Sequence, residues 1–163
     1  CADDVEALQD AIDEAEPGTD IEFRGTCGPI EIDVDGLTIE GKGTDPIITN
    51  PGEIDAVISI EGAHNLTLVD FEVEGNGTAE FGIVIEDGAF VTIEAVKVAN
   101  ATDAQVFVTT SSTLKIDGDN ELGVDGNEVG LLVSGNSFAL SDDANDIVAE
   151  TAIECEFGST FVQ

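Results

Sequence analysis

Oxygen-bearing side chains are concentrated around residue 120 in a pattern that suits a metal ion. Asp117, Asp119 and Glu121 stand at alternate positions, and Asp125 follows four residues later. Calcium takes about six to eight oxygen ligands, so this run can supply part of a site. The run departs from a complete EF-hand loop at Leu122, where that loop needs glycine. The sequence therefore predicts calcium as a cofactor at these four acidic residues; the alternative is a solvated acidic face that attracts cations diffusely.

No set of residues has the spacing of a catalytic centre. A glycoside hydrolase needs two facing carboxylates, but among 36 acidic residues some pair will have that spacing by chance. Asp142 and Asp143 are the most suggestive local pair, with a solvated turn as the alternative, and His64 has no Ser or Cys partner nearby. A lyase acting on uronates needs a basic residue, and the four available do not converge: Arg24, Lys42, Lys97 and Lys115. We assign no catalytic residue, which weighs against an enzyme without deciding the question.

Three N-glycosylation sequons occur, at Asn65, Asn76 and Asn100, each followed two residues later by Thr. They predict exposed positions if the host glycosylates its extracellular proteins. Asn76 and Asn100 also recur, with Asn127, at equivalent turns of the repeat described below. Because Asn tolerates the left-handed backbone and stacked amides bond from one coil to the next, a structural role is the alternative.

The charge balance excludes whole classes of partner. Four Lys and Arg stand against 36 Asp and Glu, which gives a net charge of -32. Nucleic acid requires a basic surface on its protein partner, and anionic membranes are disfavoured for the same reason. Cations, cationic partners or a high-salt medium remain, and self-repulsion predicts that salt or a divalent cation stabilises the protein. No apolar run approaches the ~20 residues of a transmembrane helix.

The first 18 residues predict an amphipathic capping helix over residues 2–15. Its apolar positions fall on one helical face: Val5, Leu8, Ala11, Ile12 and Ala15. Asp3 or Asp4 can cap its start, and Pro17-Gly18 ends it. Such a helix would cover the apolar end of a stack of strands.

Residues 19–163 repeat a unit of three short strands. One column of apolar pairs recurs every 22 to 28 residues: Ile30/Ile32, Ile58/Ile60, Ile83/Ile85, Val106/Val108, Leu131/Val133 and Ile153/Cys155. A second contains Leu37/Ile39, Leu66/Leu68, Val91/Ile93, Leu114/Ile116 and Phe138/Leu140, and a third, less regular one contains Phe71/Val73, Val96/Val98, Leu122/Val124 and Ile147/Val148. Since alternation puts each pair on one face, we expect a single all-β domain over 1–163. We expect a three-sided parallel β-helix of about five to six coils, with Cys155 as a buried free thiol. The alternative for Cys155 is an intermolecular disulfide or a reactive thiol.

The N-terminal pattern resembles the cap of secreted right-handed parallel β-helix proteins of the pectate-lyase-like superfamily. The residues that carry the resemblance are Cys1, Leu8-Gln9, Ala11-Ile12-Asp13, Ala15, Pro17-Gly18, Ile21, Phe23 and Gly25-Thr26-Cys27. The resemblance implies a right-handed solenoid and a disulfide between Cys1 and Cys27. The alternative is a lipidated Cys1 with Cys27 free. A sequence that begins at Cys1 favours a processed, secreted or cell-surface protein.

The last residues predict an unfinished coil. Phe161 follows Phe138 by 23 residues, so Phe161 and Val162 would form an assembly end on which a second copy stacks head to tail. The main hypothesis is thus a non-enzymatic extracellular structural protein, an acidic β-helix subunit of a self-assembling filament, surface layer or matrix. The alternative is a carbohydrate-active or carbohydrate-binding β-helix similar to polysaccharide lyases and hydrolases. The absence of Trp and Tyr argues against sugar binding, because sugar platforms usually use those rings.

Overall fold

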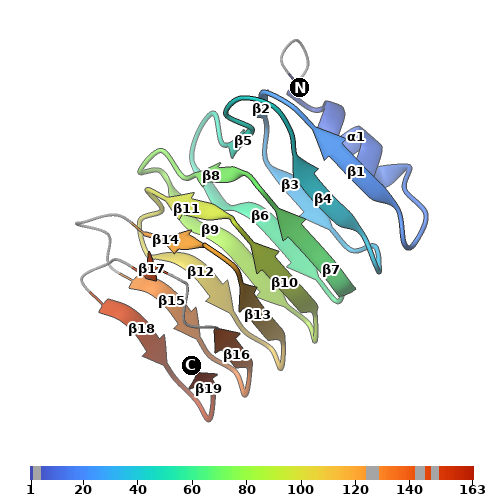
Figure 1. The fold of residues 1–163 in the computed structure, drawn as a ribbon. Helices are drawn as coiled ribbons and strands as arrows, with labels where there is room; N and C mark the ends of the chain where they lie inside the picture. The colour runs from blue at the N-terminus through green and yellow to red at the C-terminus, as the bar shows by residue number, and fades with distance from the viewer. Residues whose placement is uncertain (2–4, 124–128, 142–145, 148–150) are drawn as a thin grey trace.

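The computed structural model describes residues 1, 5–123, 129–141, 146–147 and 151–163. Over these residues one short helix, α1 (Ala7–Asp13), precedes a long succession of β-strands. Figure 1 shows the strands stacked in successive coils, with the helix at one end and the C-terminus at the other. No helix among the described residues is long and apolar enough to cross a membrane.

Three sheets form the sides of a parallel β-solenoid, and each sheet takes every third strand. Sheet A contains β1 (Asp20–Phe23), β4 (Thr38–Gly41), β7 (His64–Val69), β10 (Phe90–Glu94), β13 (Thr113–Asp117), β16 (Phe138–Ser141) and β19 (Thr160–Val162). Sheet B contains β2 (Thr26–Cys27), β5 (Ile47–Thr49), β8 (Glu72–Glu74), β11 (Lys97–Ala99), β14 (Glu121–Leu122) and β17 (Asp146–Ile147). Sheet C contains β3 (Ile30–Ile32), β6 (Ile54–Glu61), β9 (Ala79–Glu86), β12 (Ala104–Val108), β15 (Val129–Val133) and β18 (Thr151–Cys155). All pairings among the described strands are parallel, which confirms the predicted three-sided parallel architecture.

Aliphatic side chains fill the inside of the solenoid. In sheet C, Ile58, Ile83, Val106 and Leu131 are successive Cα partners on four strands, and all four are fully buried. Burying a side chain of this size contributes about 1.5–3 kcal/mol relative to leaving it exposed. The predicted column that ends at Cys155 is confirmed in register along the whole sheet.

Helix α1 lies against the first coil, as the capping prediction requires, but it is shorter than expected. Of the predicted apolar face, Leu8 and Ile12 are buried in the core, whereas Val5, which precedes the helix, and Ala11 are exposed. The helix ends at Asp13, and the N–H of Ala15 donates to the carbonyl oxygen of Ile12 at 3.0 Å in a tighter turn. The expected capping residues Asp3 and Asp4 lie outside the described residues.

A disulfide joins Cys1 to Cys27, which confirms the pairing implied by the resemblance. Cys27 lies in β2 with its side chain fully buried, opposite Ile48 of the next coil. The N–H of Gly28 also donates to the carbonyl oxygen of Val5 at 2.8 Å. The N-terminal ammonium group of Cys1 donates to the carbonyl oxygen of Arg24 at 3.2 Å. The disulfide and these two hydrogen bonds therefore hold the segment that precedes α1 to the first coil.

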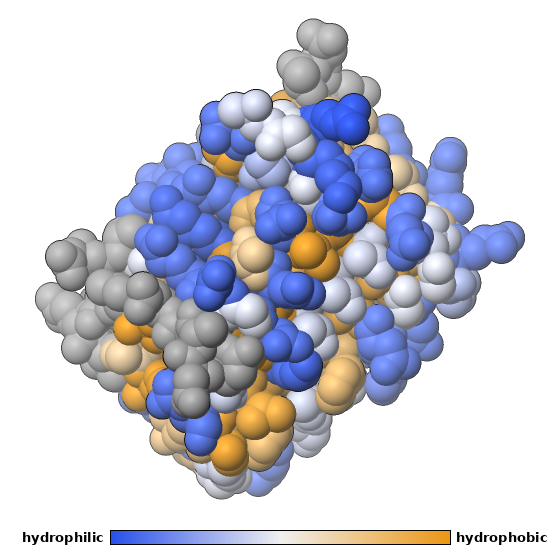
Figure 2. All heavy atoms as spheres, viewed as in Figure 1, coloured by the Kyte–Doolittle hydropathy of each residue, from blue (hydrophilic) through white to orange (hydrophobic). Residues whose placement is uncertain are grey.

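Cys155 corrects one prediction. It pairs with Val133 as the repeat predicts, but its side chain is exposed rather than buried. Strand β18 is the last described strand of sheet C, so no described strand covers its free edge. Phe157, just beyond it, is 78% exposed. Figure 2 accordingly shows hydrophobic residues gathered at the end of the molecule where the last coils lie in Figure 1.

The register of the last strands of sheet A differs by one residue from the prediction. Leu114 pairs with Ala139 rather than Phe138, so Phe138 and Leu140 point outward and are 37% and 38% exposed. A shift of one residue moves every side chain of a strand to the opposite face. Phe161 consequently pairs with Ala139 and packs against the core, whereas Val162 pairs with Leu140 and is exposed.

Sheet B departs from the predicted third column at one step, by two residues, which leaves the same face of the strand inward. Val73, Val98, Leu122 and Ile147 are successive partners. The repeat placed Leu122 opposite Val96, two residues away from its actual partner. Two further members of that predicted column lie outside the described residues: Val124 and Val148.

Candidate functional site

A groove of about 770 Å³ runs over the outer face of sheet C beside helix α1. Its walls come from α1, β3, β6, β9 and β12. Five carboxylates line it: Asp13, Glu31, Asp55, Glu61 and Glu86. The described lining contains no Lys, Arg or His, so the groove is strongly negative.

Two phenyl rings contribute to the apolar part of the groove. The rings of Phe81 and Phe107 are stacked, with centroids 5.0 Å apart and planes 29° from parallel. Phe107 stands between inward-facing Val106 and Val108, so alternation along β12 turns its ring outward. Its Cα partner on β9 is Val84, which also lines the groove. Both rings are half-buried, although neither covers the core of the solenoid.

A corner in sheet C explains why Phe81 points outward. Gly82 is buried there, and a Cβ atom on it would lie 2.3 Å from Cγ1 of Val98 and 2.6 Å from the carbonyl oxygen of Gln105. The buried amide of Gln105 accepts from the N–H of Ala101 and donates to its carbonyl oxygen, both at 3.2 Å. The inward position at this corner is thus taken by a glycine, and the preceding Phe81 is left on the outside.

Glu61 and Glu86 are in register on neighbouring strands of the groove. They are Cα partners at the ends of β6 and β9, and strands in such a sheet lie about 4.8 Å apart. Partial burial raises the pKa of Glu86 above its ordinary value, and the negative charges of Glu61 and Asp87 raise it further. The pair therefore consists of Glu86, a carboxyl group with a raised pKa, and the carboxylate of Glu61 on the neighbouring strand.

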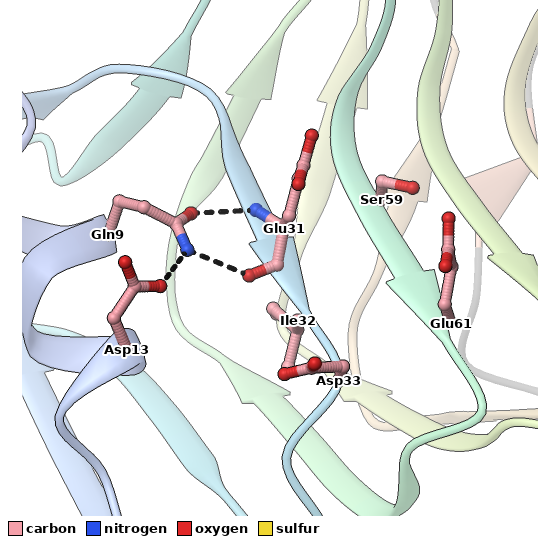
Figure 3. A pocket seen from close by; sticks show the side chains of 7 residues that line it. All are labelled: Gln9, Asp13, Glu31, Ile32, Asp33, Ser59 and Glu61. Carbon is pink, nitrogen blue, oxygen red and sulfur yellow. Dashed lines mark hydrogen bonds between the residues drawn. The ribbon is translucent and has the colours of Figure 1, made fainter.

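A smaller cavity of about 160 Å³ forms the helix end of the groove (Figure 3). The Gln9 amide accepts from the N–H of Glu31 at 2.7 Å and donates to the carbonyl oxygen of Glu31 at 3.1 Å. It also donates to Oδ1 of Asp13 at 2.6 Å. Figure 3 shows the side chains of Ser59 and Glu61 on the neighbouring strand, across the cavity from this network. Helix α1 therefore borders one end of the groove, where the Gln9 side chain is hydrogen-bonded to the backbone of β3.

The predicted calcium ligands do not form a cluster among the described residues. Asp117 accepts a hydrogen bond from Lys115, and Asp125 lies outside the described residues. The turn is held by Asn120, whose buried amide accepts from the N–H of Val96 at 2.9 Å and donates to the carbonyl oxygen of Asp117 at 2.7 Å. No group of three or more His, Cys, Asp or Glu side chains in the described part of the chain is arranged to hold a metal. Calcium at Asp117, Asp119, Glu121 and Asp125 stays a prediction.

The three sequon residues Asn65, Asn76 and Asn100 are all exposed. The Asn76 amide donates to the carbonyl oxygen of Asn50 at 2.8 Å, and the Asn100 amide donates to Glu74 at 3.0 Å. Both have positive φ, at 55° and 59°. Both side chains therefore bond between coils, with Asn50 and Glu74 as partners where the structural alternative expects a stack of equivalent Asn amides. Glycosylation stays a prediction, and Asn127 lies outside the described residues.

The other candidates from the sequence lie away from the groove. His64 contacts Asp35, and the backbone N–H of His64, which donates to the Asp35 carboxylate at 2.7 Å, lowers the pKa of that carboxyl. Lys42 pairs with Glu40 on sheet A, and Lys97 lies 3.2 Å from Glu72 on sheet B. Asp142 and Asp143 lie outside the described residues. The prediction that the basic residues do not converge is not confirmed for all four. Phe23 pairs with Gly41, and the N–H of Lys42 donates to the carbonyl oxygen of Phe23 at 2.9 Å, so Arg24 and Lys42 are neighbours on adjacent coils.

The fold is similar to that of a crystal structure described as a putative glycosyl hydrolase from Parabacteroides merdae. The match has a TM-score of 0.71 and 16% sequence identity, and it covers 97% of this chain and 86% of that chain. At this identity the likeness shows the fold alone. No family model and no curated protein matches the sequence.

Proposed function

We propose that this protein binds carbohydrate in the groove on the outer face of sheet C. The observation that carries the proposal is the stacked pair Phe81 and Phe107 in the same groove as the carboxylates of Glu61 and Glu86. A sugar ring has an apolar face of C–H groups and a rim of hydroxyls. Aromatic rings offer a large, rigid apolar platform for such a face, and ionised carboxylates are strong acceptors for hydroxyl donors.

The structural neighbour supports this proposal more than the filament hypothesis. The neighbour is described as a putative glycosyl hydrolase, and its fold matches nearly the whole chain. Nothing in the comparisons supports a filament, surface layer or matrix. The intramolecular disulfide agrees with an extracellular location, because such bonds persist in oxidising compartments.

Hydrolysis of the bound glycan is a second candidate function, favoured by the raised pKa of Glu86 next to Glu61. Glycoside hydrolysis uses one carboxylic acid to protonate the leaving oxygen and one carboxylate on the other side of the scissile bond. In this assignment Glu86 donates the proton to the glycosidic oxygen and Glu61 attacks the anomeric carbon. Water then hydrolyses the covalent intermediate, and its proton returns to Glu86.

A panel of neutral, amino-bearing and acidic polysaccharides tests both functions. Binding is measured by calorimetry on the intact protein, and cleavage is measured by the appearance of new reducing ends. We expect at least one member to bind, and Phe107→Ala to weaken that binding. A panel with no binding member would overturn the proposal. Cleavage that persists unchanged in Glu86→Gln would remove the hydrolytic assignment but leave glycan binding in place.

A further inference from the structure

We propose that the groove on sheet C selects glycans that carry free amino groups, and that it discriminates against uronate chains. This inference rests on the proposed glycan-binding function and names its substrate class. The groove is lined by carboxylates from helix α1 and three strands, and its described lining has no cation. A chain of cationic sugars complements that charge, whereas a chain of carboxylated sugars opposes it.

The distribution of the basic residues strengthens the argument. Lys42 and Lys115 lie on or beside sheet A, and Lys97 lies in sheet B. Each of them is next to a carboxylate of its own surface: Glu40, Asp117 and Glu72. The groove lies on the outer face of sheet C, and no described Lys or Arg lies among its carboxylates.

The two phenyl rings add a second attraction for an amine. A ligand cation over the face of Phe is attracted by the ring quadrupole, with about 0.5–1 kcal/mol at exposed sites. Phe107 and Phe81 lie in the same groove as Glu61 and Glu86. A chain of amino sugars in the groove can therefore stack an apolar sugar face on the rings while ammonium groups along the chain face the carboxylates. An N-acylated sugar keeps only the first of these contacts.

Three hexasaccharides of matched length separate the possibilities: a β-1,4-glucosamine hexamer, its fully N-acetylated form and an oligogalacturonate. Calorimetry is done with the intact protein at a pH where the amines are protonated, at low and at high salt. We expect the free-amine hexamer to bind about tenfold more tightly than the acetylated one at low salt. This is the order of magnitude given by one or two exposed ion pairs and a cation–π contact. The advantage should shrink at high salt, and the oligogalacturonate should not bind.

Two variants tie the preference to the groove. Glu61→Gln removes a groove carboxylate, and Glu94→Gln removes an exposed carboxylate from sheet A. We expect the first to lose most of the preference for the amine and the second to keep it. A hexalysine peptide is the control for nonspecific attraction to the charge of -32, and its binding should be independent of Phe107.

The outcomes distinguish the two proposals. Equal or tighter binding of the acetylated hexamer would overturn the amine preference and leave the glycan-binding function standing. Binding of none of the three hexamers, together with no binding in the polysaccharide panel, would overturn both. If Phe107→Ala leaves the amine preference intact and hexalysine binds as tightly as the free-amine hexamer, the preference is general charge attraction. That result also overturns the inference.

Discussion

The ring of Phe107 stacks on the ring of Phe81 from the preceding coil, 5.0 Å away, on the outside of the solenoid. In a coil of this kind the inward positions hold the apolar side chains that stabilise the fold. These two rings instead lie in a groove with Glu61 and Glu86, where they cover no core. An apolar platform placed among carboxylates on a surface of this charge is the feature that the proposed function explains.

The raised pKa of Glu86 predicts how stability changes with pH. The folded state holds this proton more tightly than the unfolded chain. The contribution to stability is therefore fully present below the ordinary carboxyl pKa and is lost as pH rises through the raised pKa of the folded state. Glu86→Gln should raise the melting temperature at neutral pH, and the gain should vanish at about pH 3, below the ordinary Glu pKa.

Because any lost negative charge relieves some repulsion in this protein, Glu86→Gln needs a matched control. Glu94→Gln removes an exposed carboxylate on β10, away from the groove. The gain in melting temperature at neutral pH should be larger for Glu86→Gln than for Glu94→Gln. Equal gains would show that Glu86 has no special environment.

Reduction of the disulfide between Cys1 and Cys27 should destabilise the fold. The bond closes a segment with a sequence separation of 26, for which the chain-entropy model gives about 3–4 kcal/mol. For a domain of this size that corresponds to a loss of roughly 10 °C in melting temperature. Thermal unfolding of Cys1→Ser measures the effect, with Cys155→Ser as the control. A Cys1→Ser variant that melts with the wild type would contradict the expectation.

The exposed thiol of Cys155 should react with a thiol reagent while the protein is folded. The other two cysteines are bonded to each other, so mass spectrometry after labelling should show one modified thiol, at Cys155. Cys155→Ser should abolish labelling. If wild-type labelling required denaturant, the side chain would be buried as the repeat alone suggests.

The sequence repeat predicts the register of sheet C because its inward positions hold Ile, Val or Leu in nearly every coil. It fails at the end of sheet A, where Ala139 and Ser141 face inward and the larger Phe138 and Leu140 face outward. A prediction based on hydrophobicity alone therefore places Phe138 and Leu140 inside, which is wrong. It also cannot show that Cys155, although in the correct column, has no described strand over it.

The groove was harder to predict than the fold. The sequence offers two signals for it. Phe107 stands between two inward valines, and Glu61 and Glu86 each follow an inward isoleucine. With 36 acidic residues, such a pair of glutamates does not stand out from its background. Phe81 faces outward only because Gly82 occupies a corner that admits no Cβ, and such a corner becomes visible only when the coils are stacked. Because the chain has no Trp and no Tyr, its composition argues against an aromatic platform, yet two phenylalanines build one.

Salt should stabilise the protein. A net charge of -32 on 163 residues produces strong self-repulsion at low ionic strength, and added salt screens it. The melting temperature should therefore rise from low to molar salt, with calcium chloride acting at lower concentration than sodium chloride. A melting temperature that stays flat over both series would contradict this account of the charge.

Glycan binding on the outer face of sheet C is tested by the affinities of wild type, Phe107→Ala and Phe90→Ala for the hexasaccharide that binds the wild type most tightly. Phe90 is 40% exposed on sheet A and serves as the matched aromatic control. Removing one ring of the platform should weaken binding about tenfold, the effect of roughly 1.4 kcal/mol of lost apolar contact. Phe90→Ala should bind as the wild type does, with both variants shown to be folded by thermal unfolding. Wild-type affinity in a folded Phe107→Ala variant would contradict a glycan site on the outer face of sheet C.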